Sequence, residues 1–438
     1  MEGIKRITAW YFGGRMPFVA RSIYPLELRA WATFSVGLGA VEGGVVGVLV
    51  KNVFAGSVND ILLNQAVAIV AGAPAFANIL SFLWARYGRG KDKVSVLRIF
   101  MLLSAISLAS ISLAPVNGIG LVMFVLGVLG TRLFWAGIVT VRSAVWRSNY
   151  SRNIRGSFTA RITVAASLIM AAIGVLAGWV LDHNMAAFRY IYPGAALAML
   201  CGRYFYGRVR VRKQRALLLA ETASEGPTGA RRGMLSILRD DRDYRRYMIC
   251  MFVFGSGNLM VLSQMIIVVT ELFDISRVQQ MLITSSIPFL AMPLTLPLWA
   301  RWFDTVGIVH YRSVQSWTFV AAIVVLALGS IQQQLPLVYV GAVIIGAGLA
   351  GGNLGWALGH NDFASDDRAT EYMGLHLTLT GIRGFVAPVT GIAFYQFLQG
   401  FRPDLAAYSL LLPLLLTTSG ALGFVAMRRE LERRRQGA

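Results

Sequence analysis

Two ionisable side chains of opposite sign lie inside long apolar stretches of the sequence. Glu42 is the one acidic residue that we place in the middle of such a stretch, and Arg132 lies in the middle of another. A charged group at membrane depth costs roughly 2.5–3.5 kcal/mol on insertion scales, so each needs a partner or a function. Either Glu42 carries a proton or contacts a solute, or it forms a structural pair with a neighbouring helix. Arg132 would bind an anionic group or neutralise Glu42, and we expect the two to approach each other or to share one central cavity near the bilayer midplane.

Other polar side chains share helical faces in later apolar stretches. His376, Thr380 and Arg383 are spaced i, i+4 and i+7, which puts them on one face of a helix. Arg383 is a second candidate for contact with an anionic group, and a structural hydrogen-bonding role is the alternative. Amide and indole groups that could orient a ligand in an apolar pocket are Asn258, Gln264, Asn353 and Trp356. For each amide, a hydrogen bond between two helices is the alternative.

The composition places these side chains in a helical membrane protein. Of the 438 residues, 56% are hydrophobic and only 14% are charged, whereas a soluble domain carries about a quarter charged residues. The apolar residues form blocks long enough to cross about 30 Å of hydrocarbon as helices. They lack the alternating polarity of barrel strands. We predict an all-α polytopic protein with about twelve spans, near 31–50, 61–84, 95–114, 118–140, 157–181, 188–206, 246–270, 279–300, 313–331, 337–359, 373–397 and 406–427.

The spans divide into two halves of six. Leu83-Trp84-Ala85-Arg86 closes the second span and Leu298-Trp299-Ala300-Arg301 closes the eighth, which favours an internal duplication. The predicted organisation is an interfacial or cytoplasmic arm at 1–30, a six-helix bundle at 31–206, a cytoplasmic linker at 207–245, a second six-helix bundle at 246–427, and a basic cytoplasmic tail at 428–438.

The distribution of charge gives an orientation. Most of the 41 Lys and Arg residues fall in segments on one side of the predicted spans. By the positive-inside rule, both termini face the cytoplasm, and we expect a bacterial-type inner membrane. This bias accounts for the net charge of +20 without a nucleic-acid partner. The two cysteines lie at helix ends, which argues against a disulfide framework.

The sequence carries no enzyme motif that fits its context. The run 346–351 spells G-x-G-x-x-G, but it lies inside a predicted span, where helix packing explains the glycines better than dinucleotide binding. We find no phosphate-binding loop, no paired Cys/His spacing for zinc and no nucleophile elbow. We therefore expect no enzyme activity, no cofactor and no metal.

The loop after the second span resembles the signature of the major facilitator superfamily, roughly Leu-Ala-Asp-Arg-x-Gly-Arg-Arg-Lys. Residues 83–91 keep its Leu, Arg, Gly, Arg and Lys but have Ala85 where the family prefers Asp. The second-half copy, 304–307, keeps only the Asp and the Gly. The resemblance implies two bundles that rock about a central cavity lined by the first, fourth, seventh and tenth helices. It also implies gating roles for Arg86, Gly88, Arg89, Asp304 and Gly307.

A second gating expectation rests on charge. The loop after the fourth span is basic and includes Arg155, whereas its counterpart after the tenth span carries Asp366, Asp367 and Glu371. Acids in such a loop oppose the usual bias of inner loops. We expect some of them to meet basic residues of the first half when the cytoplasmic side closes; solvation of an exposed loop is the alternative.

The leading hypothesis is a secondary active transporter that moves a small solute by alternating access. Arg132 and Arg383 mildly favour an anionic or polar-headed substrate, and Glu42 is the coupling site if protons drive transport. One alternative is proton-coupled efflux of amphipathic compounds, and another is a non-transporting assembly factor or sensor on the same scaffold. The expected partners are a small-molecule substrate, protons under coupling and membrane lipid, with no nucleic acid, and the expected state is a monomer.

Overall fold

Most of the described residues lie in helices. The computed structural model describes residues 22–150, 152–223, 234–364 and 369–436, and these contain helices and no strand. Eleven helical segments of this part are long and apolar enough to cross a membrane. The remaining predicted span, 188–206, is the helix α9 (Phe188–Tyr206), which carries two arginines and four tyrosines and is not among these eleven. The prediction of an all-α polytopic membrane protein is confirmed.

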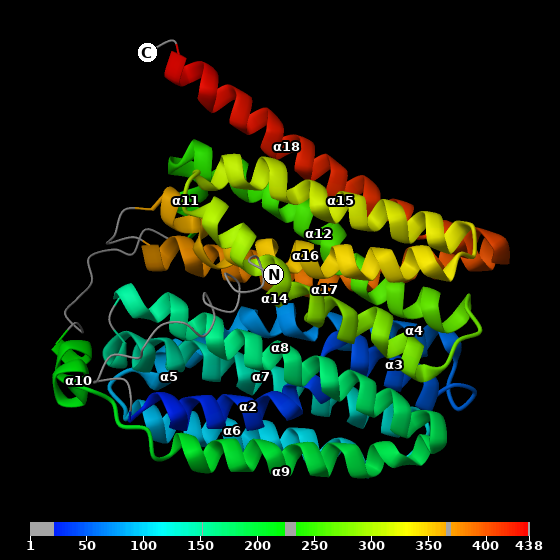
Figure 1. The fold of residues 1–438 in the computed structure, drawn as a ribbon, viewed down its shortest axis with the longest axis horizontal. Coiled ribbons are helices and arrows are strands. Elements are labelled where there is room, and N and C mark those ends of the chain that lie inside the picture. The colour runs from blue at the N-terminus through cyan, green and yellow to red at the C-terminus, as the bar shows by residue number, and fades with distance from the viewer. Residues whose placement is uncertain (1–21, 151, 224–233, 365–368, 437–438) are drawn as a thin grey trace, which may run out of the picture. The chain divides into compact units, whose positions relative to one another are not determined.

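The described residues pack as two units. The first contains the described residues of the ranges 1–42 and 80–231, and the second those of the ranges 43–79 and 232–438. The helices of the first unit are α2 (Tyr24–Ala40), α5 (Ser81–Gly88), α6 (Lys93–Ser110), α7 (Gly118–Asn149), α8 (Arg152–His183), α9 and α10 (Gln214–Ala223) (Figure 1). Those of the second are α3 (Gly43–Val53), α4 (Asp60–Phe76), α11 (Met234–Asp240), α12 (Arg242–Glu271), α13 (Arg277–Met281), α14 (Ile287–Phe303), α15 (Ile308–Ile331), α16 (Leu335–Leu358), α17 (Ala369–Phe401) and α18 (Leu411–Gln436) (Figure 1).

Two interruptions of membrane-length helices coincide with the passages between units. The first span begins at Tyr24, before the predicted start at 31, and is interrupted between α2 and α3. Two glycines open α3, and glycine is the weakest helix former after proline. In the second span, Pro74 lies inside α4 and a short 3₁₀ turn, Ala77–Leu80, follows. Residues 43–79 lie between these two interruptions and pack with the second unit. The division of the chain by a linker at 207–245 into two six-helix bundles remains a prediction.

Side-chain caps begin several of the helices. The caps of α4, α6, α7 and α12 each accept a hydrogen bond from a backbone N–H of the first turn: Asn59, Asp92, Asn117 and Asp241. Such a cap stabilises a helix by about 1 kcal/mol because it satisfies a donor that has no partner within the helix. The caps define where these helices begin, and hence which residues face their neighbours.

The Leu-Trp-Ala-Arg repeat corresponds to one packing contact made in both units. Trp84 packs on Gly137 of α7, where an added Cβ would lie 3.2 Å from the Trp84 Cγ. Trp299 packs on Gly351 of α16, where an added Cβ would lie 2.8 Å from the Trp299 Cδ2. The two tryptophans are 215 residues apart and the two glycines 214, so the contact recurs at the offset of the sequence repeat. This equivalence supports the duplication.

We expect Gly351→Ala to lower the free energy of unfolding by about 1–3 kcal/mol, because overpacking strains the atoms around an added methyl group. The new Cβ would approach atoms of Trp299, Gln315 and Tyr311, all within 3.0 Å. The measurement is the thermal unfolding midpoint of the purified protein in detergent. Gly194→Ala in α9 is the matched control, since nothing lies within 4 Å of its Cβ position and alanine favours a helix. Equal midpoints for the two variants would contradict the close contact.

Candidate functional site

Glu42 and Arg132 form an ion pair in the first unit. Nη2 of Arg132 lies 2.6 Å from Oε2 of Glu42. The Arg132 side chain is 5% exposed and that of Glu42 is 20% exposed. The approach that we predicted from the two charges is therefore present, while a role in coupling or binding stays a prediction.

The interruption after α2 explains why the guanidinium lies there. The Glu42 N–H donates to the Gly39 carbonyl rather than to that of Leu38, which leaves the Leu38 carbonyl without its usual donor four residues on. Arg132 donates from Nη2 to the carbonyls of Val41 (2.6 Å) and Leu38 (3.5 Å), and from Nε to that of Val41 (3.2 Å). The C-terminal end of a helix also carries partial negative charge. The positive charge of Arg132 is thus balanced by backbone dipoles as well as by Glu42.

A second carboxylate of this unit, Glu27, escaped the sequence analysis. Its side chain is fully buried, and its Oε2 accepts a hydrogen bond of 2.6 Å from the Trp146 indole. The Arg142 guanidinium stacks nearby on the rings of Trp31 and Trp146, at 4.3 and 4.0 Å from their centroids. Glu27 was missed because it falls in 1–30, which we assigned to an interfacial arm. The available signal was Trp31, one helical turn later on the same face.

The amides predicted in the seventh span belong to the second unit and have different surroundings. Gln264 is fully buried, and its Nε2 donates to the carbonyls of Gly391 (2.9 Å) and Ser409 (3.1 Å). This is the helix-to-helix hydrogen bond that we gave as the alternative to ligand contact. Within the described part of the chain, the Oδ1 atom of the half-buried Asn258 has no hydrogen-bond partner.

The side chains predicted in the tenth span differ in exposure. Asn353 is exposed, and its Nδ2 lies 3.8 Å from the Met292 sulfur. Trp356 donates from its indole to the Thr380 hydroxyl over 3.2 Å, and its ring lies 5.6 Å from that of His376. Trp356 therefore meets the polar face of α17 that the sequence predicted.

Arg383 lies on that same face, close to a second arginine that we had not singled out. The side chains of Arg383 and Arg312 are 5% and 1% exposed, respectively. Arg312 was missed because we began the ninth span at 313, whereas α15 begins at Ile308 and encloses it. Its one local signal was Gln315, three residues on, whose Oε1 accepts a hydrogen bond of 2.7 Å from Arg312.

The gating residues predicted in the first unit lie at the end of α5. Arg86 and Arg89 are exposed, whereas Gly88 is buried and its carbonyl accepts a hydrogen bond of 2.6 Å from Lys93 Nζ. An added Cβ at Gly88 would lie 3.0 Å from Val141 of α7. Gly88 therefore allows the loop to approach α7 closely, and a gating role for the arginines stays a prediction.

The gating residues predicted in the second unit lie between α14 and α15. Asp304 and Gly307 are exposed. Gly307 precedes α15, and Asp362 Oδ2 accepts a hydrogen bond of 2.6 Å from the Ile308 N–H at the start of that helix. Asp362, rather than Asp304, is therefore the acid that stabilises this helix terminus.

A further gating expectation concerns the acids of the loop after the tenth span and Arg155 of the first unit. Asp366 and Asp367 lie outside the described residues. Arg155 and Glu371 belong to α8 and α17, but their side chains lie outside the description as well. The expected cytoplasmic ion pairs remain a prediction.

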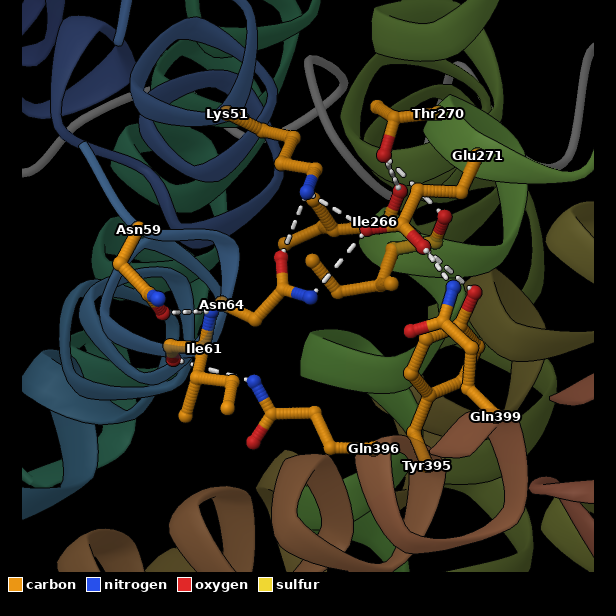
Figure 2. Close-up of polar contacts among 11 residues, drawn as sticks. Lys51, Asn59, Ile61, Asn64, Ile266, Thr270, Glu271, Tyr395, Gln396 and Gln399 are labelled. Carbon is orange, nitrogen blue, oxygen red and sulfur yellow. Dashed lines mark hydrogen bonds and ion pairs between the residues drawn. The ribbon is translucent and has the colours of Figure 1, made fainter. Parts of the chain in front are cut away.

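A polar network surrounds Glu271 in the second unit (Figure 2). Lys51 Nζ lies 2.5 Å from Glu271 Oε1 and donates to Asn64 Oδ1 over 2.7 Å. The Asn64 amide donates to the same carboxylate oxygen over 3.2 Å. Tyr395 and Gln399 donate to the other oxygen over 2.7 and 3.0 Å. The network thus joins α3, α4, α12 and α17 through one carboxylate.

We expect Glu271→Gln to lower the free energy of unfolding by about 1–3 kcal/mol. The substitution removes the negative charge that balances Lys51 and weakens the acceptor of three further hydrogen bonds. Lys51 and Glu271 are only 10% and 18% exposed, so water screens them poorly. Thermal unfolding of Glu271→Gln, Lys51→Met and the double variant would give the coupling energy. The exposed pair Arg402–Asp404, at 65% and 59%, supplies the control Asp404→Asn, which should shift the unfolding midpoint far less because water screens an exposed pair. A loss for Glu271→Gln no larger than for this control would contradict the network's role.

The comparisons with known proteins agree with this architecture. A model of the Major Facilitator Superfamily matches residues 30–388. No curated protein sequence matches the chain.

Solved structures of transporters share the fold at low sequence identity. A D-xylose–proton symporter superposes with a TM-score of 0.71 at 15% identity, covering 92% of this chain and 96% of that one. A POT family transporter in complex with a thioalcohol-conjugated peptide gives 0.64 at 12% identity, with coverage of 93% and 96%. The human organic anion transporter MFSD10 (TETRAN) gives 0.57 at 16% identity, with coverage of 92% and 100%. These likenesses confirm the fold, and the resemblance of residues 83–91 is confirmed by the family match. This chain belongs to the Major Facilitator Superfamily.

Proposed function

We propose that the protein is a secondary active transporter of a solute with an anionic or polar head group, and that Glu42 couples its transport to protons. Membership in the Major Facilitator Superfamily supports transport by alternating access. The observation that carries the proposal of coupling is the Glu42–Arg132 ion pair at the interruption between α2 and α3.

The surroundings of this pair suit a carboxylate that gains and loses a proton. Protonation of Glu42 breaks the ion pair, but the carbonyls of Val41 and Leu38 keep Arg132 in place. One N–H of the guanidinium then loses its acceptor and can bind an anionic group of the substrate. Proton binding and substrate binding are thereby linked through Arg132, without a charge left unbalanced next to lipid.

The preference for an anionic group rests on the arginines. Arg383 is buried, and among the described residues its hydrogen bonds go to neutral oxygens of Met251 and Thr380. The fold is found both in a D-xylose–proton symporter and in an organic anion transporter, so it is compatible with proton coupling and with anionic solutes. The Lys and Arg distribution supports cytoplasmic termini in a bacterial-type inner membrane, and we propose that the monomer is the working unit.

The substrate class can be tested before a substrate is known. Thermal-shift screening against sugars, nucleosides, peptides and organic acids reports any ligand that binds the folded state. We expect carboxylate- or phosphate-bearing solutes to raise the unfolding temperature and neutral analogues of the same size to have a smaller effect. Stabilisation by neutral sugars alone would contradict the anionic preference.

We expect Glu42→Gln to abolish proton-driven accumulation of the best panel solute in proteoliposomes while exchange of that solute across the membrane continues. Glutamine keeps the shape of the side chain but cannot exchange a proton. The exposed Glu432→Gln is the control and should accumulate the solute as the unaltered protein does. Full accumulation by Glu42→Gln would exclude this residue as the coupling site. An absence of transport for every stabilising solute would favour a scaffold that does not transport.

A further inference from the structure

Two arginines are buried together inside the second unit. Arg312 lies four residues after the start of α15, and Arg383 lies near the middle of α17. Their side chains are 1% and 5% exposed. The Arg383 guanidinium packs against Gly255 of α12, and the Arg312 Cζ lies 6.0 Å from the ring centroid of the adjacent Phe254, so both groups lie at the same turn of α12. Two positive charges thus share one water-poor environment.

Nothing in the described part of the chain neutralises these charges. Among the described residues, no ion pair involves either guanidinium group. Asp362, at the same end of α15, accepts a hydrogen bond from the backbone N–H of Ile308 instead. Burial lowers the pKa of the nearby His360 imidazole, which is therefore neutral at pH 7 and adds no charge.

The guanidinium groups also have unused hydrogen-bond donors. A guanidinium carries five N–H donors. Arg312 donates to Gln315 Oε1 (2.7 Å) and to the Gly352 carbonyl (3.1 Å). Arg383 donates to the Met251 carbonyl and to Thr380 Oγ1. Among the described residues, the Nε–H of each arginine has no partner, and neither has the buried His376 Nε2, whereas the Tyr247 hydroxyl interacts with the Arg312 side chain.

Glycines on the neighbouring helices make room for the two side chains. An added Cβ at Gly355 of α16 would lie 2.8 Å from the Arg312 Cζ, and one at Gly359 would lie 2.7 Å from the Tyr247 hydroxyl. An added Cβ at Gly255 of α12 would collide with the Arg383 guanidinium. The cluster is therefore accommodated by the absence of side chains at these three glycines.

The chemistry of the two guanidinium groups indicates which kind of ligand would balance their charge. Arginine stays protonated in proteins, so the positive charge cannot be relieved by loss of a proton. A buried charge without a counter-charge is costly, and a second like charge nearby adds to the cost. A planar guanidinium matches the two oxygens of a carboxylate or phosphate, and its charge-assisted hydrogen bonds are about twice as strong as neutral ones. Such an anion would displace the neutral acceptors Gln315 and Thr380.

We propose that Arg312 and Arg383 form a binding site for one oxoanion group, a carboxylate or a phosphate, with the Tyr247 hydroxyl as a further donor. The group belongs either to a soluble solute or to the head group of an anionic phospholipid. The proposal specifies which residues would give the proposed transporter its preference for anionic solutes. It rests on the proposed function where the bound ligand is a transported solute. Binding and transport are measured separately, so a failure of one is distinguishable from a failure of the other.

The test is the thermal unfolding of delipidated protein in neutral detergent, titrated with sodium phosphate, citrate or chloride at matched ionic strength. We expect phosphate or citrate to raise the unfolding temperature at concentrations where chloride does not. Arg312→Met and Arg383→Met should each abolish this rise. Arg301→Met, which removes an exposed arginine of α14 in the same unit, should retain it.

The same variants separate binding from a purely structural role. Replacing an uncompensated buried charge by an apolar side chain is often neutral or stabilising, so without oxoanions the Met variants should unfold no earlier than the unaltered protein. If the Met variants do not fold, Arg312→Lys keeps the charge but loses the planar fork, and should raise the half-maximal phosphate or citrate concentration about tenfold. Stabilisation by phosphatidylglycerol, with no response to phosphate or citrate, would identify the anion as a lipid head group.

Two results would overturn the proposal. One is an unfolding temperature of the unaltered protein that responds to none of phosphate, citrate and phosphatidylglycerol. The other is a response of Arg312→Met and Arg383→Met equal to that of Arg301→Met. In either case the two arginines would serve only to hydrogen-bond neighbouring helices.

Discussion

The cost of burying charge away from water is the constraint on which the rest of this protein depends. A guanidinium in hydrocarbon needs a counter-charge, aligned dipoles or a ligand. Arg132 has the Glu42 carboxylate and backbone carbonyls, and Arg142 stacks on two tryptophan rings. Arg312 and Arg383 have neutral acceptors alone among the described residues. Among the described residues, Arg132 thus has a counter-charge, whereas the acceptors of Arg312 and Arg383 are neutral.

Interrupted helices supply part of this balance. The end of α2 leaves backbone carbonyl groups that a continuous helix would have hydrogen-bonded internally. Arg132 donates to these carbonyl groups instead. The same interruption is where the chain passes from the first unit to the second. A carboxylate at such a point can change its charge without removing all the partners of the arginine beside it. The interruption of the helix therefore supports the proposed proton coupling, because its carbonyl groups hold Arg132 in place when Glu42 is neutral.

The proposed coupling group and the proposed anion site belong to different units. Glu42 and Arg132 lie in the first unit, whereas Arg312 and Arg383 lie in the second. Each unit also contains the Trp–Gly contact of the internal repeat, formed by Trp84 with Gly137 and by Trp299 with Gly351. The same packing contact is thus present in both units, as the predicted duplication implies, whereas the buried ionisable residues of the two units differ.

The sequence by itself determined the fold class, because blocks of apolar residues long enough to cross a bilayer can satisfy their backbone only as helices. It also predicted the approach of Glu42 to Arg132, since a mid-span charge is costly wherever its helix packs. Glu27, Arg312 and Glu271 lie near helix ends, where hydropathy does not distinguish a buried charge from a solvated one. Asn64 and Glu271 are 207 residues apart, and only tertiary packing brings them together. The tertiary structure therefore decided which terminal charges are buried and what compensates them, because that depends on neighbours contributed by distant helices.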